Sequence, residues 1–225
     1  MVAGHLAVAL ASKKLAPTTS LVWLVLAANL LDLVWPILLI VGVEHARVVP
    51  GATAFNPLVF DSYPWTHSLL MVVIWGVALG ALARAAGVAR GAAPLIGALV
   101  VSHWMLDLVT HGPDLPLWPG QAGGYGLGLW NSIPATFLVE GALWIAGIAI
   151  FLRVRRPQGW VGRLAFWSFV VVSTFIWASG PYSPPPAESG LGWFALIGWI
   201  IVPWAWWIER TSSASGPSGA RPGEA

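Results

Sequence analysis

Long apolar segments alternate along this chain with short segments that are polar or rich in Pro and Gly. Six apolar segments reach or approach the ~20 residues that a helix needs to cross the hydrocarbon core of a bilayer. These segments are Leu21–Val43, Ser68–Ala83, Ala92–Thr110, Ile133–Leu152, Leu164–Ser179 and Leu191–Ile208. The pattern therefore predicts an all-α fold, a polytopic membrane helix bundle with about six transmembrane helices.

The two ends of the chain differ from these segments. Val2–Lys14 is too short to span a bilayer, so it predicts either a short N-terminal half-helix packed into the bundle or an amphipathic surface helix. Thr211–Ala225 consists mainly of Ser, Gly, Pro and Ala, a composition typical of disorder. We therefore expect a single membrane-embedded domain over residues 1–210 and a disordered tail over residues 211–225.

Composition narrows the class of protein further. Only 9% of the 225 residues are charged and 57% are hydrophobic, whereas about a quarter of the residues in soluble domains are charged. This composition excludes a soluble monomer and a chain that is disordered throughout. The sequence has no cysteine, so a metal site would need His and carboxylate ligands.

The basic residues predict the orientation of the bundle. They gather before the first span and in every second loop after it, whereas the three opposite loops contain only Arg47. The gathered residues are Lys13, Lys14, Arg84, Arg90, Arg153, Arg155, Arg156, Arg163 and Arg210. By the positive-inside rule both termini are expected on the cytoplasmic side. The small net charge of +2 does not indicate a nucleic-acid partner, and the expected partner is the lipid bilayer.

Ionisable side chains within the apolar segments indicate function, because they are costly in a membrane. His103 and Asp107 are four residues apart, so on a helix they share one face, and His111 extends that face by another turn. A His and a carboxylate in this arrangement can hold a divalent cation. They can equally satisfy each other through a hydrogen bond, and the pair alone leaves both interpretations open.

The depths expected from helix geometry place further ionisable residues at a similar level in the membrane. At ~1.5 Å per residue, Asp32 and His103 each lie roughly 17–18 Å from the cytoplasmic start of their spans. His5 lies about 12 Å deep if its segment is a buried half-helix, and His67 stands at the outer start of the second span. Gathered around one cation with Asp107, these groups would satisfy one another, whereas unpaired each would carry a desolvation cost.

Taken singly, some of these residues have simpler interpretations. His5 is consistent with a surface histidine near a terminus, and His67 with a polar residue at a helix start. His45 and Asp61 are expected to be solvated loop residues. Glu140, inside the fourth span, fits either a functional group or a buried partner of a neighbouring helix.

Several short motifs occur together in the first 120 residues. They are Gly4-His5-Leu6, Asn29-Leu-Leu-Asp32, Thr66-His-Ser-Leu-Leu70, Ser102-His-Trp-Met-Leu-Asp-Leu-Val-Thr110 and Leu117-Trp118-Pro119. In order and spacing they resemble the YdjM-like family of bacterial inner-membrane metal-dependent hydrolases. Where family members commonly carry a Pro-Asp-x-Asp-His run, this chain has Leu31-Asp-Leu-Val-Trp35, with one acidic residue and one His fewer.

The resemblance implies a helical domain in the bacterial inner membrane that holds a divalent metal, zinc first and manganese or iron as alternatives. The ligands that it implies are His5, Asp32, His67, His103 and Asp107. The family is also distantly similar to zinc-dependent phospholipase C, which implies hydrolysis of a phosphodiester or a lipid headgroup.

The expected function is therefore a membrane-bound metal-dependent hydrolase, with Asp32, Asp107 and His111 as the catalytic residues. Asp32 would be a ligand or a general base, Asp107 would bridge two metals if two are present, and His111 or Asp114 would shuttle protons. The alternative is a non-enzymatic membrane protein: a cation- or proton-coupled transporter that uses the same residues, or a partner-binding protein with a vestigial site. The sequence leaves the substrate and the oligomeric state open.

Overall fold

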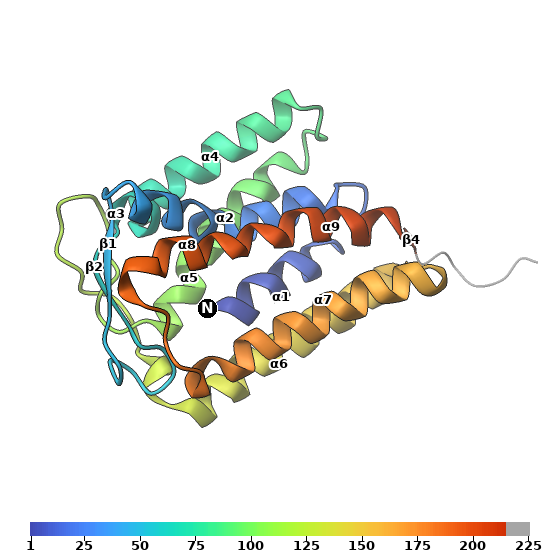
Figure 1. Cartoon of the computed structure of the whole chain (residues 1–225). Coiled ribbons are helices and arrows are strands. Elements are labelled where there is room, and N and C mark those ends of the chain that lie inside the picture. The colour runs from blue at the N-terminus through green and yellow to red at the C-terminus, as the bar shows by residue number, and fades with distance from the viewer. Residues whose placement is uncertain (215–225) are drawn as a thin grey trace, which may run out of the picture.

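Helices make up most of the chain in the computed structural model, which describes residues 1–214 (Figure 1). The long helices are α2 (Leu21–Ile40), α4 (Leu69–Ala85), α5 (Ala93–Thr110), α6 (Ile133–Val154) and α7 (Gly159–Ser179). The short helices are α1 (Val2–Ser12), α3 (Pro64–His67), α8 (Leu191–Ala195) and α9 (Ile201–Arg210), with 3-10 turns η1 (Leu129–Asn131), η2 (Gly180–Tyr182), η3 (Glu188–Gly190) and η4 (Leu196–Ile200).

The predicted membrane bundle is confirmed in its helical class, but the number of spans differs. Within residues 1–214, five helical stretches are long and apolar enough to cross a bilayer: α2, α5, α6, Gly159–Tyr182 and Glu188–Arg210. The last of these joins η3, α8, η4 and α9 end to end. Helix α4 coincides with the second predicted span, yet it has only 17 residues and falls among the shorter apolar helices.

Serine side chains mark the starts of three helices. The side chains of Ser20, Ser68 and Ser132 accept hydrogen bonds from backbone N–H groups in the first turns of α2, α4 and α6, which satisfies donors that a helix leaves free at its start. Ser68 has an extended backbone and so separates α3 from α4. Helix α3 therefore ends at His67, and that side chain turns into the bundle.

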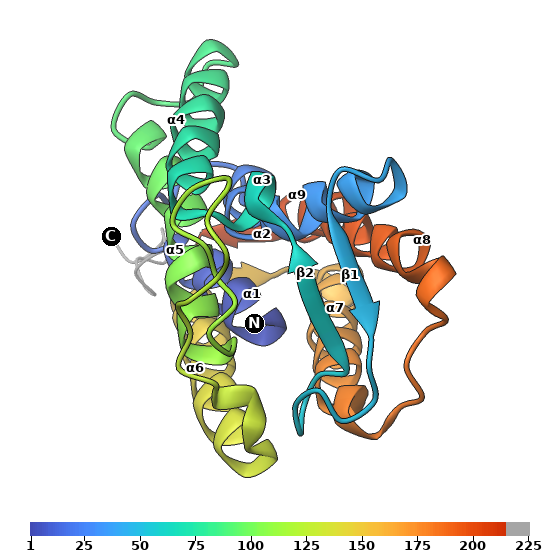
Figure 2. The same cartoon turned by 90° about the vertical axis from the view of Figure 1, so that its left-hand side faces the viewer.

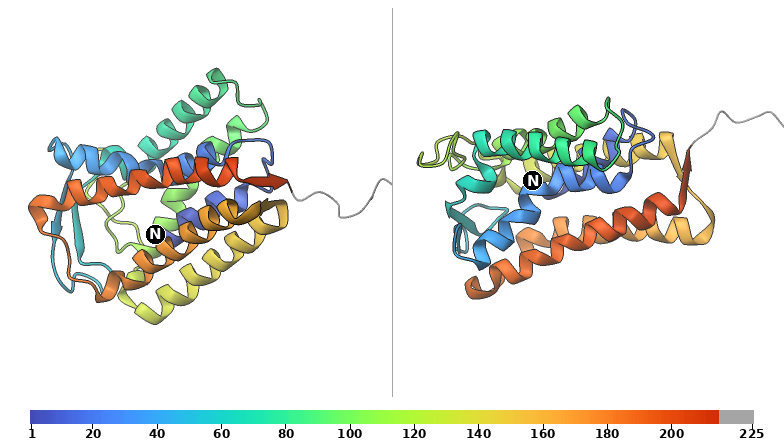
Figure 3. Two further views of the ribbon diagram at one scale, coloured as in Figure 1. Left: turned by 45° about the vertical axis from the view of Figure 1, so that its right-hand side comes forward. Right: turned by 90° about the horizontal axis from the view of Figure 1, so that it is seen from above.

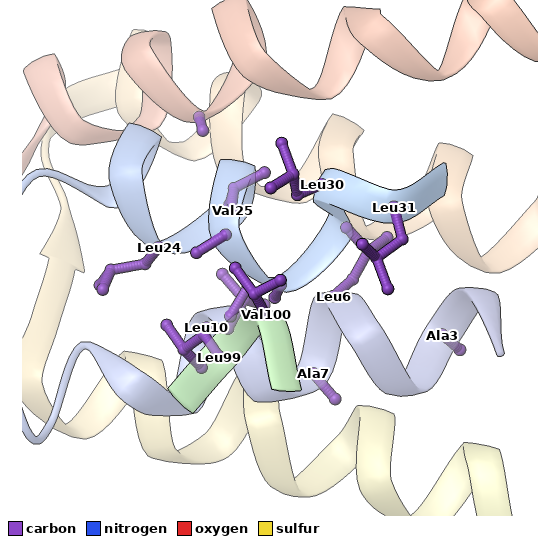
Figure 4. Packing of buried hydrophobic residues seen from close by; sticks show 14 of the residues in the cluster. Ala3, Leu6, Ala7, Leu10, Leu24, Val25, Leu30, Leu31, Leu99 and Val100 are labelled. Atoms are coloured by element: carbon purple, nitrogen blue, oxygen red, sulfur yellow. The ribbon is translucent and has the colours of Figure 1, made fainter. Parts of the chain in front are cut away.

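The N-terminal helix α1 lies inside the bundle, as the half-helix interpretation predicts. It packs against α6, α2 and α5, and its apolar side chains interlock with those of α2 and α5 (Figure 4). Gly147 permits the close contact between α1 and α6, because a Cβ atom at this position would lie 2.5 Å from the carbonyl oxygen of Ala7. Helices α6 and α7 run side by side below α1 (Figure 3).

Two short β ribbons occupy segments that the sequence indicated as loop or tail. Strands β1 (His45–Val48) and β2 (Leu58–Ser62) form an antiparallel hairpin that closes one end of the bundle (Figure 2). At the opposite end β3 (Arg155–Pro157) pairs with β4 (Ser212–Ala214). The predicted disorder is therefore wrong for residues 212–214, and the remaining residues of that tail, 215–225, lie outside the described part of the chain.

A buried ion network holds the end of the bundle that carries β3 and β4. Lys13 Nζ donates to both carboxylate oxygens of Glu209 at 3.0 Å and also to the carbonyl oxygen of Thr19. The same carboxylate accepts a hydrogen bond from the Leu21 backbone N–H at 3.0 Å and one from Arg155 at 3.1 Å. We call this group the Lys13–Glu209 network.

Candidate metal centre

Four separate segments bring the five predicted ligands to one place. Helix α1 supplies His5, α2 supplies Asp32, α3 supplies His67, and α5 supplies both His103 and Asp107. Their side chains meet near the start of α1, and the start of α1 lies towards the end of the bundle that carries the β1–β2 hairpin (Figures 1 and 2). The sequence argument from depth is consistent with this arrangement.

One half of the cluster surrounds the Oδ2 atom of Asp107. His103 Nε2 lies 3.1 Å from it and His67 Nε2 lies 3.7 Å from it. The same two nitrogen atoms each lie 3.6 Å from Asp32 Oδ1. Two imidazole nitrogens and two carboxylate oxygens from three elements therefore face one another across a space the size of an ion.

The other half of the cluster surrounds Asp107 Oδ1. His5 Nε2 lies 3.1 Å from this atom, and the His5 ring stacks on that of His103 with the centroids 3.6 Å apart. The Met1 amino nitrogen donates to Asp107 Oδ1 at 2.7 Å, and His111 Nε2 lies 4.0 Å from it. A carboxylate oxygen accepts, so His5 Nε2 carries the proton in this hydrogen bond, and the Nδ1 atom has no hydrogen-bond partner within residues 1–214.

The tautomer of His103 is fixed by the backbone of α2. Its Nδ1 atom lies 2.9 Å from the carbonyl oxygen of Ala28, and a carbonyl oxygen can only accept. Nδ1 must therefore carry the proton, which leaves a lone pair on Nε2 in the neutral ring. The Nε2 atom of His103 is buried, has no hydrogen-bond partner within residues 1–214 and faces two carboxylates. It therefore requires a cation or a proton.

The tautomer of His67 is fixed by a chain of two further residues. Glu44 accepts the Thr66 hydroxyl at 2.7 Å, and it also accepts the backbone N–H groups of Trp65 and Thr66, each at 2.8 Å. Since the hydroxyl proton goes to Glu44, Thr66 Oγ1 must accept from His67 Nδ1, 2.7 Å away. The Nε2 lone pair of His67 therefore also faces the carboxylates.

This donor set fits a divalent metal. The residues form two groups of three, and in each group one ligand atom from every residue lies within 4.8 Å of the other two. The first group is His5, His103 and Asp107, and the second is Asp32, His67 and His103. Neutral imidazole and carboxylate are the ligands that Zn²⁺, Mn²⁺ and Fe²⁺ accept in proteins. Because both groups use His103, a single Nε2 atom cannot serve two metals at once.

The cluster is buried except on one side. The side chains of His5, His67, His103 and Asp107 are at most 4% exposed, whereas that of Asp32 is 43% exposed. Asp32 therefore marks the side on which the cluster is least covered. The low exposure elsewhere strengthens electrostatic interactions within it, because little water screens them.

His111 stands at the edge of the cluster in a network of its own. Its Nδ1 atom lies 3.0 Å from Asp114 Oδ1, so that Nε2 faces Asp107. The Tyr63 hydroxyl donates to the same Asp114 oxygen at 2.7 Å. Burial, reinforced by the charge of Asp114, raises the pKa of Tyr63 well above its ordinary value, so Tyr63 remains a donor at neutral pH.

Other ionisable residues take separate places. His45 is exposed, and Asp61 forms an ion pair with Arg47 at 2.7 Å, as expected for solvated residues. Glu140 is fully buried and accepts the Ala3 backbone N–H at 3.2 Å, so it caps the start of α1. The sequence analysis missed Glu44, whose only local signal was its position beside His45.

No protein-family model, no curated protein and no solved structure matches this chain. The geometry of the cluster therefore carries the functional conclusion by itself.

Proposed function

We propose that this protein is a metal-dependent hydrolase of the bacterial inner membrane, consistent with the resemblance of its motifs to the YdjM-like family. One observation carries the proposal. The Nε2 lone pairs of His67 and His103 and the carboxylate oxygens of Asp32 and Asp107 converge, and two neighbouring contacts fix the tautomers that make this so.

Asp32, His67, His103 and Asp107 would hold the metal, and His5 would join them through its Nε2 atom once that atom has given up its proton. Zinc fits the donor set, and manganese or iron would fit it as well. A metal so held would supply Lewis-acid chemistry: it would lower the pKa of a bound water towards neutrality and polarise a phosphoryl or carbonyl oxygen. Thr66 and Glu44 orient the His67 ring, and such supporting contacts commonly strengthen metal binding 10–100-fold.

His111 is placed to move protons beside these residues. Its Nδ1–H donates to Asp114, so its Nε2 atom is free to accept a proton from a water near Asp107 and to return it to a leaving group. Tyr63 holds Asp114 in position through its hydroxyl. This division of roles keeps Asp32 and Asp107 as ligands, and it makes His111 the general acid and base.

The proposed substrates are phosphodiesters, lipid headgroups included. Two features support this class: the helices around the cluster have the length and apolarity of membrane spans, and the partly exposed side of the cluster is the one that Asp32 occupies. A lipid could therefore reach the cluster from the bilayer past Asp32.

The apolar core favours hydrolysis over transport. Helices α1, α2 and α5 fill the region on the side of the cluster away from the hairpin with aliphatic side chains, among them Leu10, Leu24 and Leu99 (Figure 4). A cation or proton pathway would need polar groups there.

The test is hydrolysis of phosphodiester and phospholipid substrates by protein reconstituted in lipid nanodiscs. We expect activity that a chelator removes and that added metal restores. His111→Ala should lower kcat roughly 10²–10⁴-fold with its bound metal retained, and the exposed His45→Ala serves as the matched control. A metal-loaded protein that cleaves none of these substrates, or an unchanged rate in His111→Ala, would contradict the proposal.

A further inference from the structure

A second feature of the molecule lies on the α4–α5 hairpin, away from the metal centre. The two helices come into close contact at Gly76 and Gly97, where an added Cβ atom would lie 2.8–3.1 Å from the opposite carbonyl oxygen. Beside this contact runs a groove with a volume of about 560 Å³. Its walls are apolar, and Val73 and Val77 on α4 are 44% and 69% exposed.

The groove ends in positive charge. Arg84 closes α4 and Arg90 precedes α5, and both side chains line the groove and are exposed. Arg84 donates one hydrogen bond, to the carbonyl oxygen of Val88 at 3.1 Å, which leaves its remaining N–H groups free for a ligand. Within residues 1–214, no acidic side chain lines the groove and none forms an ion pair with either arginine.

The length of the groove matches one leaflet of a bilayer. From Val73 to Arg84 the helix rises ~16 Å at 1.5 Å per residue, and half of a hydrocarbon core is ~15 Å thick. The arginines stand at the opposite end of α4 from His67. An apolar channel of this length with two guanidinium groups at its end matches an acyl chain attached to an anionic phosphate.

We propose that the α4–α5 groove binds one anionic phospholipid, with an acyl chain along Val73, Val77 and Ala81 and the phosphate held by Arg84 and Arg90. This site is separate from the metal centre and would hold its lipid whether or not the protein is a hydrolase. Guanidinium groups bind phosphate oxygens in pairs, and the net negative charge of the lipid would set the preference, because the choline group of phosphatidylcholine cancels the charge of its phosphate.

The test measures the binding of phosphatidylglycerol and phosphatidylcholine with identical acyl chains to the purified, delipidated full chain, by native mass spectrometry. Phosphatidylglycerol should bind the more tightly. The double variant Arg84→Gln/Arg90→Gln should bind it roughly 30-fold more weakly, at about fivefold per charge. The matched control is Arg153→Gln/Arg156→Gln, which removes two exposed arginines from the other basic loop at this end of the bundle.

A second variant tests the apolar part of the groove without altering charge. Ala81→Phe fills the channel and should weaken the binding of both lipids, whereas Ala78→Phe, on an exposed face of α4 outside the groove, should not. Equal affinity for the two lipids, or the same loss in the loop control as in the groove variant, would overturn the proposal. The proposal would also be overturned if the protein formed a dimer that Ala81→Phe dissociates while lipid binding stays unchanged. The groove would then be an interface between two copies.

Discussion

Two buried polar clusters stand at opposite ends of this bundle, and they differ in how their charges are satisfied. In the Lys13–Glu209 network every contact joins a donor to an acceptor, because Lys13, Arg155 and a backbone N–H all donate to one carboxylate. In the metal centre, lone pairs of His67 and His103 face the oxygens of Asp32 and Asp107. In the first cluster each charged group has a partner of opposite charge, although the Nε atom of Arg155 has no hydrogen-bond partner within residues 1–214. The second cluster needs a cation or a proton.

This difference assigns the two clusters different roles. Removing one partner of a matched buried pair leaves an unpaired charge and costs stability. Removing one candidate ligand from the metal centre, where the lone pairs of His67 and His103 face carboxylate oxygens, should mainly cost affinity for the cation. Stability and metal content should therefore respond to different substitutions.

The largest effect on stability is expected at Lys13. Lys13→Met would leave Glu209 without its closest charged partner and lower the free energy of unfolding by about 3 kcal/mol, read from thermal unfolding in detergent. Lys14→Met, which removes an exposed neighbour, should have little effect. Bound metal should stay at the wild-type amount in both variants, and a parallel loss of metal in folded Lys13→Met would remove the distinction between the clusters.

The next effect concerns the placement of α1. Gly147→Ala puts a Cβ atom against the backbone of Ala7, so α1 must shift at a cost of roughly 1–3 kcal/mol. Because His5 lies on α1, we also expect weaker metal binding, measured by competition with a chelator of known affinity. Gly141→Ala meets only an ordinary contact 3.4 Å away and should change neither quantity. Unaltered metal affinity in Gly147→Ala would exclude His5 from the ligand set.

A smaller effect on affinity is expected from Thr66→Val. The substitution removes the hydroxyl through which Glu44 fixes the His67 tautomer, and it should weaken metal binding about tenfold. Thr136→Val removes a buried hydroxyl that bonds only backbone carbonyl groups, so it controls for the loss of a buried polar group. If the two variants bound metal equally well, the tautomer argument would fail.

The exposed ion pair of the hairpin should contribute least. The hydrogen bond from Arg47 lowers the pKa of Asp61 below 3.8, so the stability that the pair provides is present above pH 3.8 and is lost as the pH falls through the lowered pKa. The melting temperatures of the wild type and Asp61→Asn should therefore differ slightly at neutral pH and converge below pH 3.8. A difference that grows as the pH falls would show the opposite linkage.

The sequence predicted the parts of the molecule that periodicity and composition encode. The apolar segments located the long helices, and rare polar residues within or beside them identified four of the five clustered candidate ligands. His5 required the half-helix interpretation, which the close contact between Gly147 and Ala7 explains. The number of full-length spans could not be read from hydropathy alone, because α4 is apolar up to Arg84 in its last turn yet has only 17 residues.

Local sequence patterns could not predict the residues that support the two clusters. Glu44 stands beside an exposed histidine, and only the fold of the β1–β2 hairpin returns the chain so that Thr66, 22 residues later, meets its carboxylate. The Lys13–Glu209 network joins residues 196 apart in the sequence. Such pairings depend on how the helices pack, and neither residue type nor spacing reveals them in a single sequence.

The most direct test of the central claim is elemental analysis of the purified protein after expression with zinc, manganese and iron supplied. The account predicts a divalent metal in stoichiometric amount in the wild type and in Lys13→Met, and its loss in His103→Ala and Asp107→Ala. A wild-type protein that contains no divalent metal, or variants of His103 and Asp107 that retain it, would contradict the account.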